Sequence, residues 1–294
     1  MTCSLFLRKA LETRLAPAAR QWFKGAAGEI ADGAGNGRFC ALLSLASRHA
    51  SRASLAPSAN ELEQAERMLP GWNPERWTQL ETLRVALLLS RPDLGGDGGA
   101  LALSEAFRYA DEGELCALYR SLALLPGPER FTWRAGEGCR TNMRSVFEAT
   151  ALDTPFPARW FDDLAWRQVV VKCLFVGAPL WRLSGLDQRL SAELARMVLD
   201  LADERRSAGR PIPHELWACL GPYGGARGLD ALEREIAPEN PDAAGRSAAV
   251  FAFARAGDTG RLGSLARTET DPTVQKALEL ARSGPVPARA FGTL

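Results

Sequence analysis

A single lysine interrupts an apolar helical pattern near the middle of the chain. Lys172 lies within the otherwise apolar run 169–176, and Gln168 lies one turn earlier on the same predicted helix face. A buried ammonium group needs an anionic partner or a lowered pKa. The Lys172 amine is therefore expected either to be buried in an ion pair or to reach the edge of the helix. Four carboxylates of the same segment could pair with it: Glu148, Asp153, Asp162 and Asp163.

This segment has a functional and a structural interpretation. In the first, Lys172 binds an anionic ligand or acts as a base in a polar pocket that tryptophans help to line. In the second, an ion pair ties the helix to the preceding turn and the tryptophans pack in the core. We favour the structural interpretation because perturbed charges mark functional sites only probabilistically. The candidate ligand-binding residues are Glu148, Asp153, Asp162, Asp163, Trp166, Gln168, Lys172, Trp181 and Arg182.

Few residues could support the common catalytic or metal chemistries. The chain has two histidines, His49 and His214, and the pair His214-Glu215 lacks the second histidine of a zinc-protease motif. Its six cysteines are widely spaced and include no CxxC pair, so neither a zinc site nor a disulfide framework is predicted. We expect no metal and no cofactor, and we expect a binding role rather than an enzyme. No catalytic residue is assigned.

The apolar residues recur at the spacing of helices. Leu115, Leu118, Leu122 and Leu125 would line one helix face, and similar patterns occur at 77–87 and 190–201. The chain contains only 3 Ile, 10 Val and 3 Tyr, so the residues that favour strands are scarce. The sequence therefore predicts an all-α fold.

Helix boundaries follow from local capping chemistry. Ser58 and Glu61 have the spacing of a capping box, and Asn73 and Asp271 each precede a proline that suits a first helical turn. The two prolines of the segment 154–157 each bias the residue before them away from helical angles. We expect this segment to be extended and to form a rigid elbow.

The C-terminal third contains a weak internal repeat. Asp242, Arg246, Ala248 and Ala252 recur 29 positions later as Asp271, Gln275, Ala277 and Ala281. In a HEAT-type unit an Asp caps a helix whose alanines allow close packing on the next unit. We expect an α-α superhelix with HEAT-like helical pairs at 226–283, and an irregular helical bundle is the alternative.

Charge and hydropathy limit the classes of partner. The net charge is +1, so no nucleic acid is expected as a partner, and a nucleic-acid-binding repeat protein is only a minor alternative. The longest apolar stretch, 173–181, is far shorter than the roughly 18 residues of a membrane span. The first 16 residues carry four charged side chains among their leucines, unlike a secretion signal. We therefore expect a cytoplasmic protein.

Several motifs resemble those of one bacterial family, the EboA family. They are 146–149 (Val-Phe-Glu-Ala), the elbow 153–157, the helix 166–175 with Gln168 and Lys172, and the turn 177–180. Later blocks at 203–210, 215–217 and 221–223 are similar to the same family. The resemblance covers roughly residues 100 to 225, and the order of the motifs is more specific than any one of them.

The resemblance implies a role in specialised metabolism. Members of the family are encoded with a UbiA-like membrane prenyltransferase and predicted metal-dependent enzymes, in clusters associated with making or exporting a metabolite. It implies an accessory protein that acts as a helical scaffold for a partner enzyme or a metabolite; the alternative is an enzyme with a pocket around Lys172. We expect a single domain, 1–294, with N-terminal helices at 1–95, an EboA-like core at 100–225, the helical pairs and a tail at 284–294.

Overall fold

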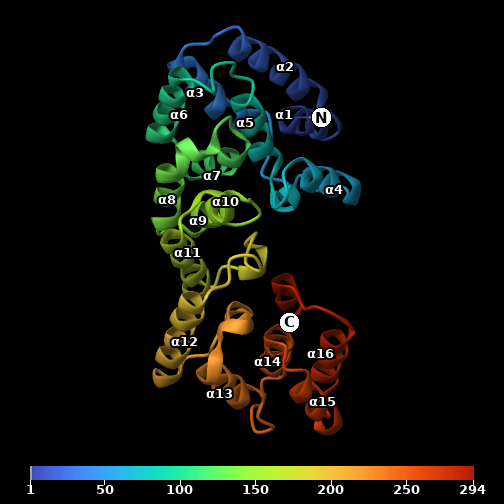
Figure 1. The fold of residues 1–294 in the computed structure, drawn as a ribbon. Coiled ribbons are helices and arrows are strands. Elements are labelled where there is room, and N and C mark those ends of the chain that lie inside the picture. Colours follow the sequence, from blue (N-terminus) through green and yellow to red (C-terminus); the bar gives the residue numbers. More distant parts are fainter. Residues whose placement is uncertain (1) are drawn as a thin grey trace. The chain divides into compact units, whose positions relative to one another are not determined.

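The computed structural model describes residues 2–294, with residue 259 described by its backbone alone. Within this range the chain forms sixteen α-helices and eight short 3-10 helices, and its only strand-like pairing is an isolated bridge between Ser54 and Thr78 (Figure 1). The all-α prediction is confirmed. No helix of the described residues is long and apolar enough to cross a membrane.

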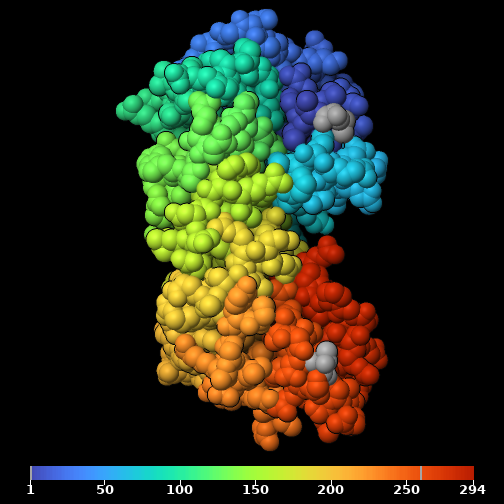
Figure 2. Space-filling model, viewed as in Figure 1, coloured from blue at the N-terminus to red at the C-terminus, as the bar shows by residue number. Residues whose placement is uncertain are grey.

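The chain divides into two compact units, Met1–Ala165 and Trp166–Leu294. Side chains fill the spaces between the ribbons within each unit (Figure 2). The domain boundaries expected from the sequence stay predictions. The first unit contains α1 (Cys3–Arg14), α2 (Pro17–Ala31), α3 (Asn36–Leu45), η1 (Ala46–Arg48), α4 (Ala59–Met68), η2 (Pro74–Arg76), α5 (Gln79–Leu88), α6 (Asp97–Tyr109), α7 (Glu112–Ser121), η3 (Leu122–Leu124), η4 (Pro128–Phe131), α8 (Thr132–Arg140), α9 (Arg144–Ala151) and α10 (Phe156–Trp160).

Helix α5 forms the centre of the first unit. It packs against α1, α2, α3 and α7, and every side chain from Leu80 to Leu88 except that of Glu81 is buried. A capping box starts it, because the Thr78 hydroxyl accepts from the Glu81 amide while the Glu81 carboxylate accepts from the Thr78 amide. The capping boxes of α4, at Ser58 and Glu61, and the Asn73 cap of η2 are confirmed.

The elbow prediction is wrong. Pro155 has helical angles, φ −77° and ψ −1°, and the next five residues form α10. A proline fixes φ near the helical value and lacks an N–H that the first turn does not use, so it can start a helix. The bias against helical angles before Pro157 is a preference, and burial of Phe156 and Pro157 outweighs it.

The second unit begins within helix α11 (Asp163–Val176), whose first three residues belong to the first unit. Helix α14 is buried on most of its surface and packs against α13, α16 and η6. The remaining elements are η5 (Leu180–Arg182), α12 (Ala192–Ser207), η6 (His214–Cys219), η7 (Gly221–Tyr223), α13 (Gly225–Ile236), α14 (Ala243–Ala256), α15 (Thr259–Thr268), α16 (Pro272–Ser283) and η8 (Ala288–Thr293).

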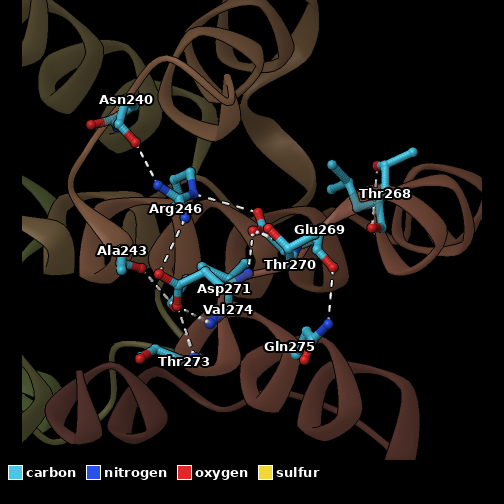
Figure 3. Close-up of polar contacts among 12 residues, drawn as sticks. Asn240, Ala243, Arg246, Thr268, Glu269, Thr270, Asp271, Thr273, Val274 and Gln275 are labelled. Carbon is cyan, nitrogen blue, oxygen red and sulfur yellow. Dashed lines mark hydrogen bonds and ion pairs between the residues drawn. The ribbon is translucent and has the colours of Figure 1, made fainter.

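The repeated residues hold α14 and α16 together. Asp242 and Asp271 each cap a helix by accepting two backbone N–H bonds. The Arg246 guanidinium extends from α14 to the carboxylates of Glu269, 3.4 Å away, and Asp271, 3.5 Å away (Figure 3). The equivalent Gln275 donates to the Glu269 carbonyl instead. These contacts link the two copies of the 29-residue sequence repeat, both of which lie in the second unit. The HEAT-like superhelix itself stays a prediction.

Candidate ligand site

A cavity lies in the first unit near the N-terminal ends of α5, α7 and α9. These helices are labelled in Figure 1. The volume of the cavity is about 210 Å³. Most of its lining surface is apolar, but four charged side chains from α5, α7 and the loop before α4 also line it, which distinguishes it from a packing defect in an apolar core. Its lining residues are Arg52, Thr78, Leu80, Glu81, Arg84, Glu112, Gly113, Cys116 and Ser145.

Arg84 brings a buried cation to this cavity. The residue is only 5% exposed. Its Nε donates to the Leu43 carbonyl at 3.2 Å, and its Nη2 is 3.4 Å from the Glu114 carboxylate. Its Nη1 donates no hydrogen bond to any of the residues that the structure describes. Burial lowers the pKa of Arg84, and Glu114 opposes this shift, so the guanidinium stays charged with an unused donor.

A second guanidinium group, that of Arg52, lies near the Arg84 guanidinium beside Gly113. Gly113 lies in the first turn of α7, and a Cβ at this position would be 3.3 Å from Arg84 Nη1 and 3.6 Å from Arg52 Nη2. Arg52 is exposed and forms no ion pair within the described chain. Two guanidinium nitrogens therefore lie close together beside Gly113, with Asp111 Oδ1 3.5 Å from the same Cβ position. Two guanidinium groups placed in this way suit an oxyanion.

The carboxylates around the cavity are occupied by local structure. Glu114 and Asp111 form the capping box of α7. Glu81 caps α5 and lies 2.9 Å from the Arg120 guanidinium. Glu112 accepts a hydrogen bond from the Ser145 hydroxyl. These acids fix the helix ends, whereas the two arginines retain donors for a ligand.

The thiol of the cavity is not activated. Burial raises the pKa of the Cys116 thiol, so it stays protonated at neutral pH and is a poor nucleophile.

On the other side of Arg84, a mainly apolar void of about 30 Å³ lies among α3, α5, α6 and α7. It has room for about one water molecule. Among the described residues, no group of three His, Cys, Asp or Glu side chains could hold a metal ion.

Four of the sequence-predicted site residues lie in the first unit. Glu148 of α9 pairs with the Arg144 guanidinium at 2.8 Å. Asp153 is buried with φ +58°, and its carbonyl accepts from the Asn73 amide at 2.9 Å. Asp162 accepts from the Ala165 amide at 2.7 Å and so starts α11, and Asp163 is the first residue of that helix. The structure thus places each of these four residues in a local contact or at a helix start.

The other five lie in the second unit. Trp166 is buried, with the Arg189 guanidinium 5.0 Å from its ring centre. On the same helix Gln168 is exposed and Lys172 is half-buried. Trp181 of η5 packs against Gly292, where a Cβ would come within 2.6 Å of the ring. Arg182 ends η5. Their assembly with the four carboxylates into one ligand pocket stays a prediction.

Sequence reasoning missed Arg84 although its signal is present. Arg84 interrupts the apolar pattern of 83–89 in the same way that Lys172 interrupts 169–176. It also missed Glu215, whose carboxylate accepts from the Leu180 amide at 2.6 Å and from the Trp181 amide. Burial raises the pKa of Glu215. Its role here is to cap η5 from a position 35 residues later in the chain.

Comparison with known families agrees with the resemblance seen in the sequence. The family model described as "Metabolite traffic protein EboA" matches residues 3–221, which include the whole cavity. A comparison with curated proteins and one with solved structures each found no match. Because the matched segment spans about three quarters of the chain, the protein belongs to the EboA family.

Proposed function

We propose that this protein is an accessory protein of a metabolite biosynthesis or export pathway, and that it binds a metabolite in the cavity at Gly113. It would present that metabolite to a partner enzyme encoded in the same gene cluster. The description of its family as a metabolite traffic protein supports the general role. We also propose that it acts in the cytoplasm, as expected from its sequence.

The observation that carries this proposal is the buried Arg84 guanidinium with its unused Nη1 donor. Arg84 Nη1 makes no hydrogen bond within the described chain and Arg84 lines the cavity, so the donor is available to an acceptor on a ligand. Arg52 lies at the entrance to the same space and adds a second cation. Both arginines lie within the segment that matches the family.

The chemistry of the cavity supports binding rather than transformation. Arginine side chains remain protonated, so Arg52 and Arg84 can hold an anion but do not accept a proton from it. Glu81 and Glu114 are engaged in helix caps and ion pairs, and the Cys116 thiol is neutral. The two arginines that are left to meet an anion are donors that orient it.

Native mass spectrometry tests this function directly. The tagged full-length protein would be purified from its host while the neighbouring genes are expressed, and its bound masses would be measured. We expect a bound small molecule, released unchanged on denaturation, and a stoichiometric protein partner. A preparation with neither would contradict the proposal, and a product that accumulates with time from a bound precursor would show an enzyme instead.

An enzyme with a site around Lys172 is the second candidate. It is supported by the half-buried position of Lys172 beside the exposed Gln168 on α11. Lys172→Met tests it in the same host. Loss of pathway output with an unchanged melting temperature would favour this candidate, while unchanged output and folding would contradict it.

A further inference from the structure

We propose that the cavity at Gly113 binds a carboxylate group, held between the guanidinium groups of Arg84 and Arg52. This inference rests on the proposed function and names the class of its ligand, a small molecule that carries one carboxylate. The two donors lie close together on the cavity wall, because an ideal Cβ on Gly113 would be 3.3 Å from Arg84 Nη1 and 3.6 Å from Arg52 Nη2. A carboxylate has two oxygens in a plane, so it can accept from both guanidiniums at once.

The neighbouring acids favour a single negative charge on the ligand. Glu114 lies 3.4 Å from the Arg84 guanidinium, and Asp111 Oδ1 would be 3.5 Å from the Gly113 Cβ. Glu112 lines the same cavity. Doubling the ligand's charge doubles both its repulsion by these acids and its attraction to Arg84 and Arg52. Because the three acids outnumber the two arginines, a carboxylate is favoured over a phosphate dianion.

The rest of the cavity indicates a short ligand of mixed polarity. Leu80 and Cys116 provide apolar surface, and Ser145 with Glu112 provides a hydroxyl and a carboxylate. The volume of about 210 Å³ has room for a few heavy atoms beyond the carboxylate. A chain of two or three carbons with a hydroxyl group would meet these surfaces in turn.

Two substitutions test the site while keeping the fold. Gly113→Ala adds a methyl group 3.3 Å from Arg84 Nη1 and 3.6 Å from Arg52 Nη2, where it obstructs the approach of a carboxylate to both donors. It changes no charge and suits a helical position. Its matched control is Gly136→Ala in α8, where the new Cβ would likewise lie 3.2 Å from an arginine nitrogen, Arg140 Nη1, but outside the cavity. Arg52→Gln removes the exposed cation, and Arg48→Gln in η1 is its control.

Binding would be measured on the full-length protein by ligand-observed NMR, with acetate, propionate and lactate as probes. Inorganic phosphate and methylammonium, at matched ionic strength, are the comparison probes. We expect the carboxylates to bind wild type and both controls, with a Kd that rises about tenfold in Gly113→Ala and in Arg52→Gln. The first variant obstructs a charge-assisted hydrogen bond and the second removes one. Folding of every variant would be checked by its circular dichroism and melting temperature.

Several results would overturn the inference. One is carboxylate binding that is equal in wild type and Gly113→Ala, because the ligand would then sit elsewhere. Stronger binding of phosphate or methylammonium than of all three carboxylates would show that the charge argument is wrong, and no binding of any carboxylate would remove the site. If a metabolite without a carboxylate copurifies with the protein, this inference fails while the proposed function stands; if nothing copurifies, the proposed function fails.

Discussion

At the scale of single residues, a left-handed backbone angle at Ala56 offers a clean test of conformational strain. Its φ is +48°, and its side chain is exposed. A left-handed angle costs an L-residue roughly 1 to 2 kcal/mol, and glycine escapes that cost but loses more freedom on folding. We therefore expect Ala56→Gly to raise the free energy of unfolding by about 0.5 kcal/mol in urea denaturation.

Ala53 provides the control for this prediction. Like Ala56, it is exposed and its amide donates to the hydroxyl of a serine two residues earlier, but its φ is not positive. Ala53→Gly should lower the free energy of unfolding by about 0.5 kcal/mol, because only the loss of freedom applies. Equal losses in both variants would show that Ala56 stores no strain.

A half-buried carboxyl of α13 gives the second prediction. Burial raises the pKa of Glu235 from 4.5, with Asp242 adding to the shift while Arg206, Asn240 and His214 oppose it. The folded chain thus keeps this proton to higher pH than the unfolded chain does. The stability that Glu235 contributes is therefore complete below pH 4.5 and declines as pH rises through the raised value.

Glu235→Gln removes this titration and keeps an oxygen for Asn240. Relative to wild type, its free energy of unfolding should increase when urea denaturation is repeated from about pH 4 to about pH 7. The exposed Glu239→Gln variant controls for the general effect of removing a charge. A difference between Glu235→Gln and wild type that stays constant across this range would contradict the prediction.

At the scale of elements, the ion pairs of Arg246 are expected to hold α14 against the turn before α16. The side chains of Arg246 and Glu269 are 10% and 12% exposed, so removal of Arg246 leaves the Glu269 carboxylate buried without its ion-pair partner. We expect Arg246→Met to lower the free energy of unfolding by about 3 kcal/mol. The control is Arg210, whose ion pair with Glu204 is exposed and has a similar N–O distance. Arg210→Met should lower the free energy of unfolding by less than about 1 kcal/mol.

A double-mutant cycle separates this pair from simple packing. Glu269→Gln alone should also destabilise, and the double variant should lose less than the two single losses together by at least about 1 kcal/mol. Urea denaturation of the four proteins gives the coupling energy. Additive losses would show that Arg246 acts through its buried alkyl chain.

Elements also show what could be predicted from the sequence and why the rest could not. The caps at Ser58, Asn73 and Asp271 were predictable because a cap acts within three residues of the side chain that makes it. Arg84 with Glu114, and Glu215 with η5, join residues 30 and 35 positions apart. Such pairs depend on how helices pack, which local spacing does not encode. Pro155 was wrongly predicted because two opposing local preferences compete there, and burial decides between them.

At the scale of the whole molecule, the family match and the compact units divide the chain differently. The match to the EboA family ends at residue 221, before α13, while the units meet between residues 165 and 166. The cavity at Gly113 lies wholly in the first unit, and the Arg246 contacts lie wholly in the second. The cavity and the helices α13–α16 can therefore be perturbed one at a time.

Hydrogen exchange measured by mass spectrometry tests whether the two units open independently. A unit with its own core can open without its neighbour, so a local loss of stability should stay within it. We expect Arg246→Met to speed exchange in α13–α16 and to leave α1–α10 unchanged. Propionate should slow exchange at the starts of α5 and α7 alone, and Gly113→Ala should abolish that effect. Faster exchange throughout residues 2–294 in Arg246→Met would instead show one cooperative domain, as the sequence alone predicts, because a single core transmits the loss to every helix.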